Sequence, residues 1–512
     1  MQTPLQNSKF SLDSSGVAGF FGGDVAVSAM ATVHVHEGRK WRGWYNSPGS
    51  YEIGKQYGRV AASQLWNSLY PGPDVHPAVL FGLDGGQGPR YIAARSGTIM
   101  PKTGHVAFLF AQECKKLEPW QIEVGGASPL IHRDMYPTVS RTTSATLSPD
   151  SSSAISGSTS PTVSGHTSLT IAEMDTDAMR LKERKTTPMG VTIVKLHDIP
   201  PETTYYPRLL KTYSSLFASI PIIVSFATSF ACAYFDDWIC CAMILLGIMS
   251  GGLSCLVLGS GKLTFRRPDP ARGAPRGDGF LEADDELVVL LGVESTVNSI
   301  TKGRFSLDFK SEPQYHNIGI SAVMLTAQFL AQLLLIPQGT LFGQLMFISS
   351  LAVSWAYNSY LASFNMEKVQ RDILVKDVLR LDKQSMRKFE LGTRTTAVVF
   401  TMLVLRPINI EEQLVHLLPN KTRVWTRWRE TISRMIAVTD VDKPLNFDQI
   451  ESRVYDGLDE DEMELLRTLY RDAAAAHAYY QQHRAVSQAG NKSSSTCGLS
   501  SPNTHCAARY SH

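Results

Sequence analysis

Apolar positions gather in four long stretches of this chain, and none of these stretches contains Lys, Arg, Asp, Glu or His. The stretches are residues 216–235, 238–259, 318–336 and 341–364. A helix needs about 20 predominantly apolar residues to cross a bilayer, so the pattern predicts four transmembrane helices. Buried helices of a soluble protein are the alternative, but these usually carry a polar edge, and four unbroken stretches favour lipid.

Short turns join the first stretch to the second and the third to the fourth. Asp236-Asp237 forms the first turn, and residues 337–340 form the second. Each pair is therefore interpreted as a helical hairpin, residues 216–259 and residues 318–364. We expect Asp236 and Asp237 to be solvated at their turn.

Lys and Arg flank both hairpins but are missing from both turns. Examples are Arg208 and Lys211 before the first hairpin, Arg266 and Arg267 after it, and Lys368 after the second. Basic residues near a span resist translocation, whereas short loops without them cross freely. The pattern predicts a multi-pass membrane protein with both termini in the cytosol, and it does not identify the organelle.

The region before the hairpins is predicted to hold a small mixed α+β cytosolic domain, residues 25–135, after a disordered start, residues 1–24. Residues 25–36 alternate between apolar and polar or small positions, which is the period of a half-buried strand. Residues 78–83, 91–94 and 105–110 are expected as further short strands joined by Gly/Pro turns. On the first strand, His34 and His36 are expected to form an exposed surface pair.

A Ser/Thr-rich stretch, residues 136–189, has too few large apolar residues to fold and is predicted to be a disordered linker. It leads into a juxtamembrane segment, residues 190–215. Ser148, Ser160 and Thr187 each precede a proline and suit proline-directed phosphorylation, although such pairs also arise by chance in a Ser-rich sequence.

The region after the second hairpin is predicted to be mainly helical, and residues 286–300 of the connector are expected to form a helix or a strand. A cytosolic connector, residues 260–317, joins the hairpins, and a cytosolic helical region, residues 365–486, precedes a disordered tail, residues 487–512. Within that region we expect a helix over residues 365–390. Residues 397–405 are too short to span a bilayer and are expected to form a buried strand.

The spacing of apolar and basic positions over residues 422–436 predicts an amphipathic helix, with tryptophans on one stripe and arginines around it. Its candidate contact residues are Arg423, Trp425, Arg427 and Trp428. An aromatic and basic helix suits a membrane interface, where cations meet anionic lipid head groups. The alternative is a helix that packs its tryptophan stripe onto the cytosolic domain.

Polar residues inside the spans are the candidate packing or pore-lining positions. They recur every four residues as Gln328 and Gln332 in the third span and as Ser350, Ser354 and Asn358 in the fourth. We expect hydrogen bonds between these two stripes to hold the second hairpin together. Gly247 and Gly251, four residues apart in the second span, are expected to allow close helix packing.

Composition limits the remaining functions. The chain has 512 residues, a formal net charge of +2 and 19% charged residues, which is not the composition of a general nucleic-acid-binding protein. Its seven cysteines show no spacing typical of a zinc site or a disulfide framework. His132-Arg133-Asp134 lacks the asparagine that a kinase catalytic loop needs, because Val139 stands there. We therefore predict no enzyme, cofactor or metal.

The sequence over residues 341–360, together with residues 86–92, resembles multi-pass membrane proteins of fungi, and the resemblance extends over residues 40–130 and 200–440. It implies a multi-pass membrane fold and carries no activity or site residue. We expect a non-enzymatic membrane scaffold that binds cytosolic proteins or lipid and is able to oligomerise. The alternatives are an oligomeric channel or transporter lined by the polar stripes, and a membrane-anchored enzyme.

Overall fold

The computed structural model describes residues 22–61, 64–73, 75–120, 187–197, 204–211, 214–309, 315–438 and 457–496. The described part is mostly helical, with a few strands. The chain divides into two compact units. The first comprises residues 1–118, 191–388 and 405–413, and the second comprises residues 119–190, 389–404 and 414–512.

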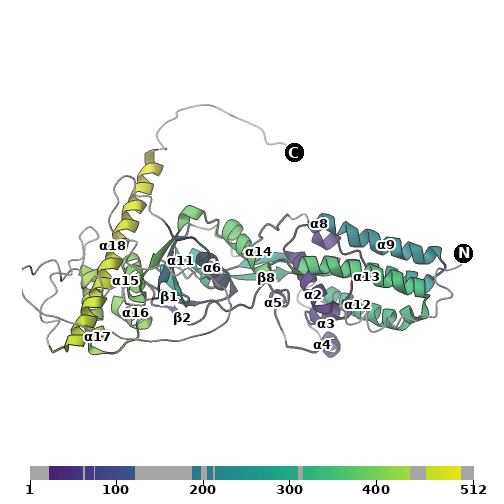
Figure 1. The fold of residues 1–512 in the computed structure, drawn as a ribbon, viewed down its shortest axis with the longest axis horizontal. Helices are drawn as coiled ribbons and strands as arrows, with labels where there is room; N and C mark the ends of the chain where they lie inside the picture. The colour runs from purple at the N-terminus through teal and green to yellow at the C-terminus, as the bar shows by residue number, and fades with distance from the viewer. Residues whose placement is uncertain are drawn as a thin grey trace, which may run out of the picture. The chain divides into compact units, whose positions relative to one another are not determined.

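A bundle of helices forms one part of the first unit (Figure 1). Its long members are α9 (Ser219–Tyr234), α10 (Trp238–Leu258), α12 (His316–Leu335) and α13 (Leu341–Ala362). The short helices α2 (Gly23–Ala31) and α3 (Ser50–Gly58) complete the bundle. Helix α10 packs on α9 and α12, α9 also packs on α13, α2 packs on α13, and α3 packs on α12.

The four predicted spans are thus helices, but their membrane character differs. Among the described helices, Trp238–Leu258 and His316–Gln338 are long and apolar enough to cross a membrane. Helix α9 is apolar but has only 16 residues, and the 22-residue α13 is less apolar. Four membrane crossings are therefore not established by length and composition alone.

The turns of the two hairpins lie together at one end of the bundle. The Asp237 carboxylate accepts hydrogen bonds from the Thr340 backbone N–H at 2.9 Å, from the Thr340 hydroxyl at 2.6 Å and from the Cys240 N–H at 3.0 Å. Thr340 in turn caps α13 by accepting from the Gly343 N–H at 3.2 Å. The prediction that Asp237 is solvated is wrong, because this capping role buries it to 4% exposure.

Two sheets lie mostly in the rest of the first unit, and β9 continues into the second unit. The larger has the order β2-β1-β6-β7-β3-β9. Its strands are β1 (Arg90–Ala93), β2 (Ile99–Met100), β3 (Met189–Lys195), β6 (Gly279–Glu282), β7 (Glu286–Leu291) and β9 (Met386–Leu391). The smaller joins β4 (Thr204–Tyr205), β5 (Lys262–Arg266) and β8 (Arg304–Asp308), with Phe265 opposite Phe305. Because β5 follows α10 and β8 precedes α12, this sheet ties the two hairpins together.

The first unit contains further helices beside the bundle and the sheets. They are α4 (Gln64–Leu69), α5 (Pro77–Leu80), α6 (His105–Lys115), α8 (Ser214–Phe217), α11 (Glu294–Thr301) and α14 (Met366–Ile373). Short helical turns occur at Thr32–His34, Arg39–Trp41, Ile336–Gln338, Leu374–Val378 and Lys383–Ser385. Helix α6 packs on α11, on α14 and on β7.

The prediction of a separate N-terminal domain is wrong, because residues 1–118 belong to one unit with residues 191–388. Most of the strands predicted in that domain are also wrong. Residues 25–36 form α2 and a helical turn, because Ala26, Ala29 and Met30 are buried at helical spacing. Residues 105–110 belong to α6, and residues 78–83 include α5. The strand predicted at residues 91–94 is confirmed as β1, but it pairs with β6 from the connector, as Tyr91 lies opposite Leu281.

The second unit contains four helices in its described residues, and two of them correct a prediction. They are α15 (Arg394–Leu405), α16 (Ile410–Leu417), whose first turn belongs to the first unit, α17 (Arg423–Val438) and α18 (Glu460–Thr496). Residues 397–405 are therefore helical, not a strand. Helix α18 continues to Thr496, so the first ten residues of the predicted disordered tail are helical. The helix predicted over residues 365–390 ends near Val378 and gives way to β9.

Candidate functional site: a polar centre in the helical bundle

A loop from the N-terminal region enters the bundle between its long helices. We call residues 43–49, which connect the Arg39–Trp41 turn to α3, the inserted segment. Glycines on α10 make room for it: a Cβ on Gly251 would lie 3.0 Å from the Tyr45 carbonyl oxygen, and a Cβ on Gly247 would collide with the Asn46 side chain. Both glycines therefore lie against this segment, and a Cβ on Gly247 would also lie 3.0 Å from Gln332 Nε2 of α12.

Asn358 on α13 bonds to the inserted segment at both ends of its amide. Its Oδ1 accepts from the Tyr45 hydroxyl at 2.7 Å, and its Nδ2 donates to Ser47 Oγ at 3.0 Å. Asn358 lies 313 residues from Tyr45 and 311 residues from Ser47 in the sequence. Asn358 therefore fixes the segment against α13.

The glutamine stripe of α12 makes the equivalent contacts on the other side. Gln332 Nε2 donates to Asn46 Oδ1 at 3.3 Å and to the Met243 carbonyl oxygen of α10 at 3.1 Å. Gln328 Nε2 donates to Gln332 Oε1 at 3.3 Å, and the Ser250 hydroxyl donates to Gln328 Oε1. The stripe therefore links α12 to α10 and to the inserted segment.

The serine stripe of α13 faces α9. The Ser350 and Ser225 hydroxyls lie 3.2 Å apart, and Ser225 Oγ also accepts from the Asn46 backbone N–H at 3.1 Å. Ser354 is fully buried, and its hydroxyl has no hydrogen-bond partner in the described part of the chain. The predicted bonds between the α12 and α13 stripes are absent from the hydrogen bonds of these described residues, because each helix packs on a different neighbour.

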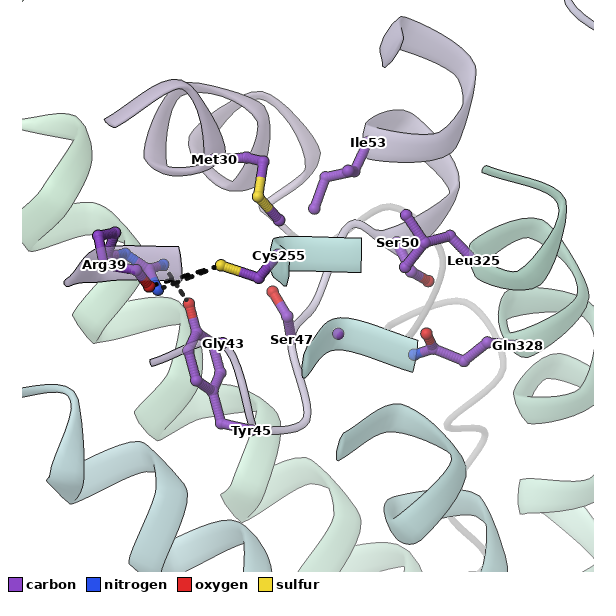
Figure 2. Close-up of a pocket in the computed structure, with 11 residues that line it drawn as sticks. Met30, Arg39, Gly43, Tyr45, Ser47, Ser50, Ile53, Cys255, Leu325 and Gln328 are labelled. Carbon is purple, nitrogen blue, oxygen red and sulfur yellow. Dashed lines mark hydrogen bonds between the residues drawn. The ribbon is translucent and has the colours of Figure 1, made fainter. Parts of the chain in front are cut away.

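One cation, Arg39, lies at the edge of this polar centre and is 2% exposed. Its Nη2 donates to the Tyr45 hydroxyl at 3.0 Å, and its Nη1 lies 3.7 Å from Cys255 Sγ. Figure 2 shows these contacts beside a small cavity with about 10 Å³ of space for the centre of a water-sized sphere, which is room for about one water.

Two histidines close to this region are buried rather than exposed. His34 is 2% exposed and His36 is 3% exposed, so the predicted surface pair is wrong. His34 Nδ1 lies 3.3 Å from the Gly261 carbonyl oxygen, and its ring meets the Phe81 ring edge-on at 4.4 Å. Burial lowers the pKa of His34 to about 4 and also lowers the pKa of His36.

The remaining candidate residues lie apart from the polar centre in sequence. On α17, Trp428 is fully buried, whereas Arg423 is exposed and Trp425 and Arg427 are half-buried. Helix α17 packs on α18. This contact favours the alternative in which the helix packs its tryptophan stripe onto the cytosolic domain over a membrane interface. Thr187 is exposed just before β3, and Ser148 and Ser160 lie outside the described residues.

Sequence pattern does not point to Arg39, Tyr45 or Asn46 as site residues. Residues 41–49 have no helical or strand period, and their aromatic and glycine content predicts ordinary turns. Within the described residues, no three His, Cys, Asp or Glu side chains are placed to hold a metal ion. Searches against protein-family models, curated proteins and solved structures found no match, so the resemblance to fungal membrane proteins stays a prediction.

Proposed function

We propose that this chain is a multi-pass integral membrane protein that crosses the bilayer with α9, α10, α12 and α13. The supporting observation is the distribution of side chains in the bundle, which has polar groups inside and large apolar groups outside. The exposed apolar residues on these helices include Ile220, Ile223, Phe226, Phe230, Trp238, Leu245, Met249, Leu253, Ile320, Val323, Leu330, Leu334, Leu345 and Trp355.

A soluble helical bundle has the opposite arrangement, because water rewards polar surface and apolar burial. In lipid, an apolar outer face costs nothing, and buried Ser, Asn and Gln side chains hold helices together. The lower hydropathy of α13 follows from its inward stripe, where Ser350, Ser354 and Asn358 are all buried. Extraction of the membranes at alkaline pH tests this step: the chain stays with the lipid if it is integral.

Within the membrane the proposed role is that of a non-enzymatic scaffold. The polar groups of the bundle bond to one another and to the inserted segment, which makes the bundle a packed anchor. The sheets of the first unit and the helices of the second are then the parts that bind protein partners. The Lys and Arg residues that flank the hairpins support a cytosolic location for both.

A channel lined by the polar stripes is less well supported. Gln328, Gln332, Ser350 and Asn358 are all engaged in hydrogen bonds, and the inserted segment occupies the space between their helices. Ion flux through the reconstituted protein that is lost in Asn358→Leu would favour the channel over the scaffold.

Cross-linking in living cells tests the scaffold role. Full-length chain should recover the same cytosolic proteins in independent experiments, and a membrane protein of similar abundance provides the background. If no cytosolic partner is recovered reproducibly, the scaffold proposal is wrong, whereas the membrane topology is unaffected.

A further inference from the structure

Arg39 is a buried cation without a carboxylate partner in the described part of the chain. The guanidinium donates to the neutral Tyr45 hydroxyl, and the acceptor near Nη1 is the Cys255 sulfur, a weak acceptor. Its Nε has no hydrogen-bond partner among the described residues. A buried charge is costly unless it is paired, so this arrangement calls for a negative charge nearby.

The aromatic rings around Arg39 supply only part of that compensation. The guanidinium carbon lies 5.9 Å from the centre of the Tyr45 ring and 5.6 Å from the centre of the Tyr357 ring. Such contacts attract a cation but leave its net charge in place. Cys255 is not the missing anion in this geometry, because its thiol donates to the Arg39 carbonyl oxygen at 3.6 Å.

A second positive feature borders the same cavity. Helix α3 begins at Ser50, which lines the cavity together with Arg39, and no side chain caps this helix end. The first N–H groups of a helix carry partial positive charge and bind anions. Arg39 and Ser50 thus line the same cavity, and the guanidinium and the start of α3 both favour an anion. In Figure 2 the Cys255 side chain lies between these two residues.

We propose that this cavity binds a single monatomic anion of the chloride class, with Arg39 as its main partner. The cavity has room for about one water, which suits a monatomic anion better than a phosphate or a substituted carboxylate. Ser50, which is 5% exposed, places a hydroxyl at the cavity as a further donor for the ion. The ion neutralises the buried charge and thereby stabilises the inserted segment in the bundle.

Thermal unfolding of the purified full-length chain in detergent tests the site. Chloride is titrated against gluconate at constant ionic strength, so that only the identity of the anion changes. The wild-type midpoint should rise by several degrees and then saturate, because an ion that binds only the folded state stabilises it. Bromide should act like chloride, since it is also monatomic.

Two arginine variants separate the site from general salt effects. Arg39→Gln should remove the chloride dependence, whereas Arg42→Gln, which alters an exposed arginine three residues away, should keep it. The proposal is overturned if the wild-type midpoint is the same in chloride and gluconate, or if Arg39→Gln retains the full shift.

The wild-type chain alone decides the question if Arg39→Gln does not fold. Equal stabilisation by phosphate would point to an oxyanion such as a lipid head group and would overturn the monatomic ion. Stabilisation by chloride and bromide without phosphate supports it. These outcomes do not depend on whether the scaffold proposal holds.

Discussion

The helical bundle and strands β6 and β7 of the larger sheet belong to the same unit but distribute their side chains in opposite ways. In the sheet, Phe280, Val288 and Val289 are fully buried, and the turn that joins β6 to β7 exposes Asp284 and Asp285. In the bundle, Ser225 and Ser350 are fully buried, and apolar rings cover the outside. This difference is what we expect if water surrounds the sheet and, as we propose, lipid surrounds the bundle.

Removing one phenylalanine from each region gives the largest expected contrast. Phe280→Ala leaves a cavity in the sheet and should lower the free energy of unfolding by about 3–5 kcal/mol. Phe230→Ala, at a side chain that is 73% exposed on α9, should change it by less than about 1 kcal/mol in lipid. Chemical unfolding in lipid–detergent micelles measures both, and equal losses would contradict lipid around the bundle.

The next effect concerns pH. Because burial holds the pKa of His34 at about 4, whereas the unfolded chain has the ordinary value near 6.5, protons bind the unfolded state first. Stability should therefore be highest above pH 6.5 and fall by roughly 3 kcal/mol as the pH drops to 4. Unfolding measured across this range tests the sign, and His34→Gln should flatten the curve; a wild type that gains stability at pH 5 would refute this account.

A smaller loss is expected at the glycine that receives the inserted segment. Gly247→Ala should reduce the free energy of unfolding by about 1–3 kcal/mol through overpacking against Asn46, although Ala is the better helix former. The matched control is Leu245→Ala on the same helix, where the side chain is 40% exposed. A stabilising Gly247→Ala, measured by thermal unfolding in detergent, would place the segment elsewhere.

The smallest expected difference in stability is between losing a hydrogen-bonded polar side chain and losing one without a hydrogen bond. Asn358→Leu leaves the Tyr45 and Ser47 hydroxyls without their partner and should cost about 1–2 kcal/mol. Ser354→Ala, one turn away on α13, removes a buried hydroxyl that has no partner within the described chain and should be close to neutral. Comparable losses in the two variants would show that Asn358 does not hold the segment.

Sequence pattern predicted the long helices well and the inserted segment not at all. The four apolar stretches match α9, α10, α12 and α13 within a few residues, because an apolar run of this length has few other uses. Position-by-position alternation misled over residues 25–36, since small Ala and Val residues satisfy both the strand and the helix period there.

Sequence pattern predicts the helical residues of the polar centre but not the loop residues that they bind. Four-residue spacing, which points side chains to one face of a helix, identifies Gln328, Gln332, Ser350 and Asn358. Their partner Asn46 was missed because it lies in an irregular loop 286 residues from Gln332, and no local signal relates the two. Long-range pairing of this kind is decided by tertiary packing.

Glycosylation mapping tests the central claim, that two hairpins enter the bilayer with their turns on the far side and the rest of the chain in the cytosol. A sequon engineered into a lengthened Asp236-Asp237 turn should be modified, while the native sequons at Asn420 and Asn491 should stay unmodified. Modification of Asn420 or Asn491, or an engineered turn that is never modified, would contradict the account.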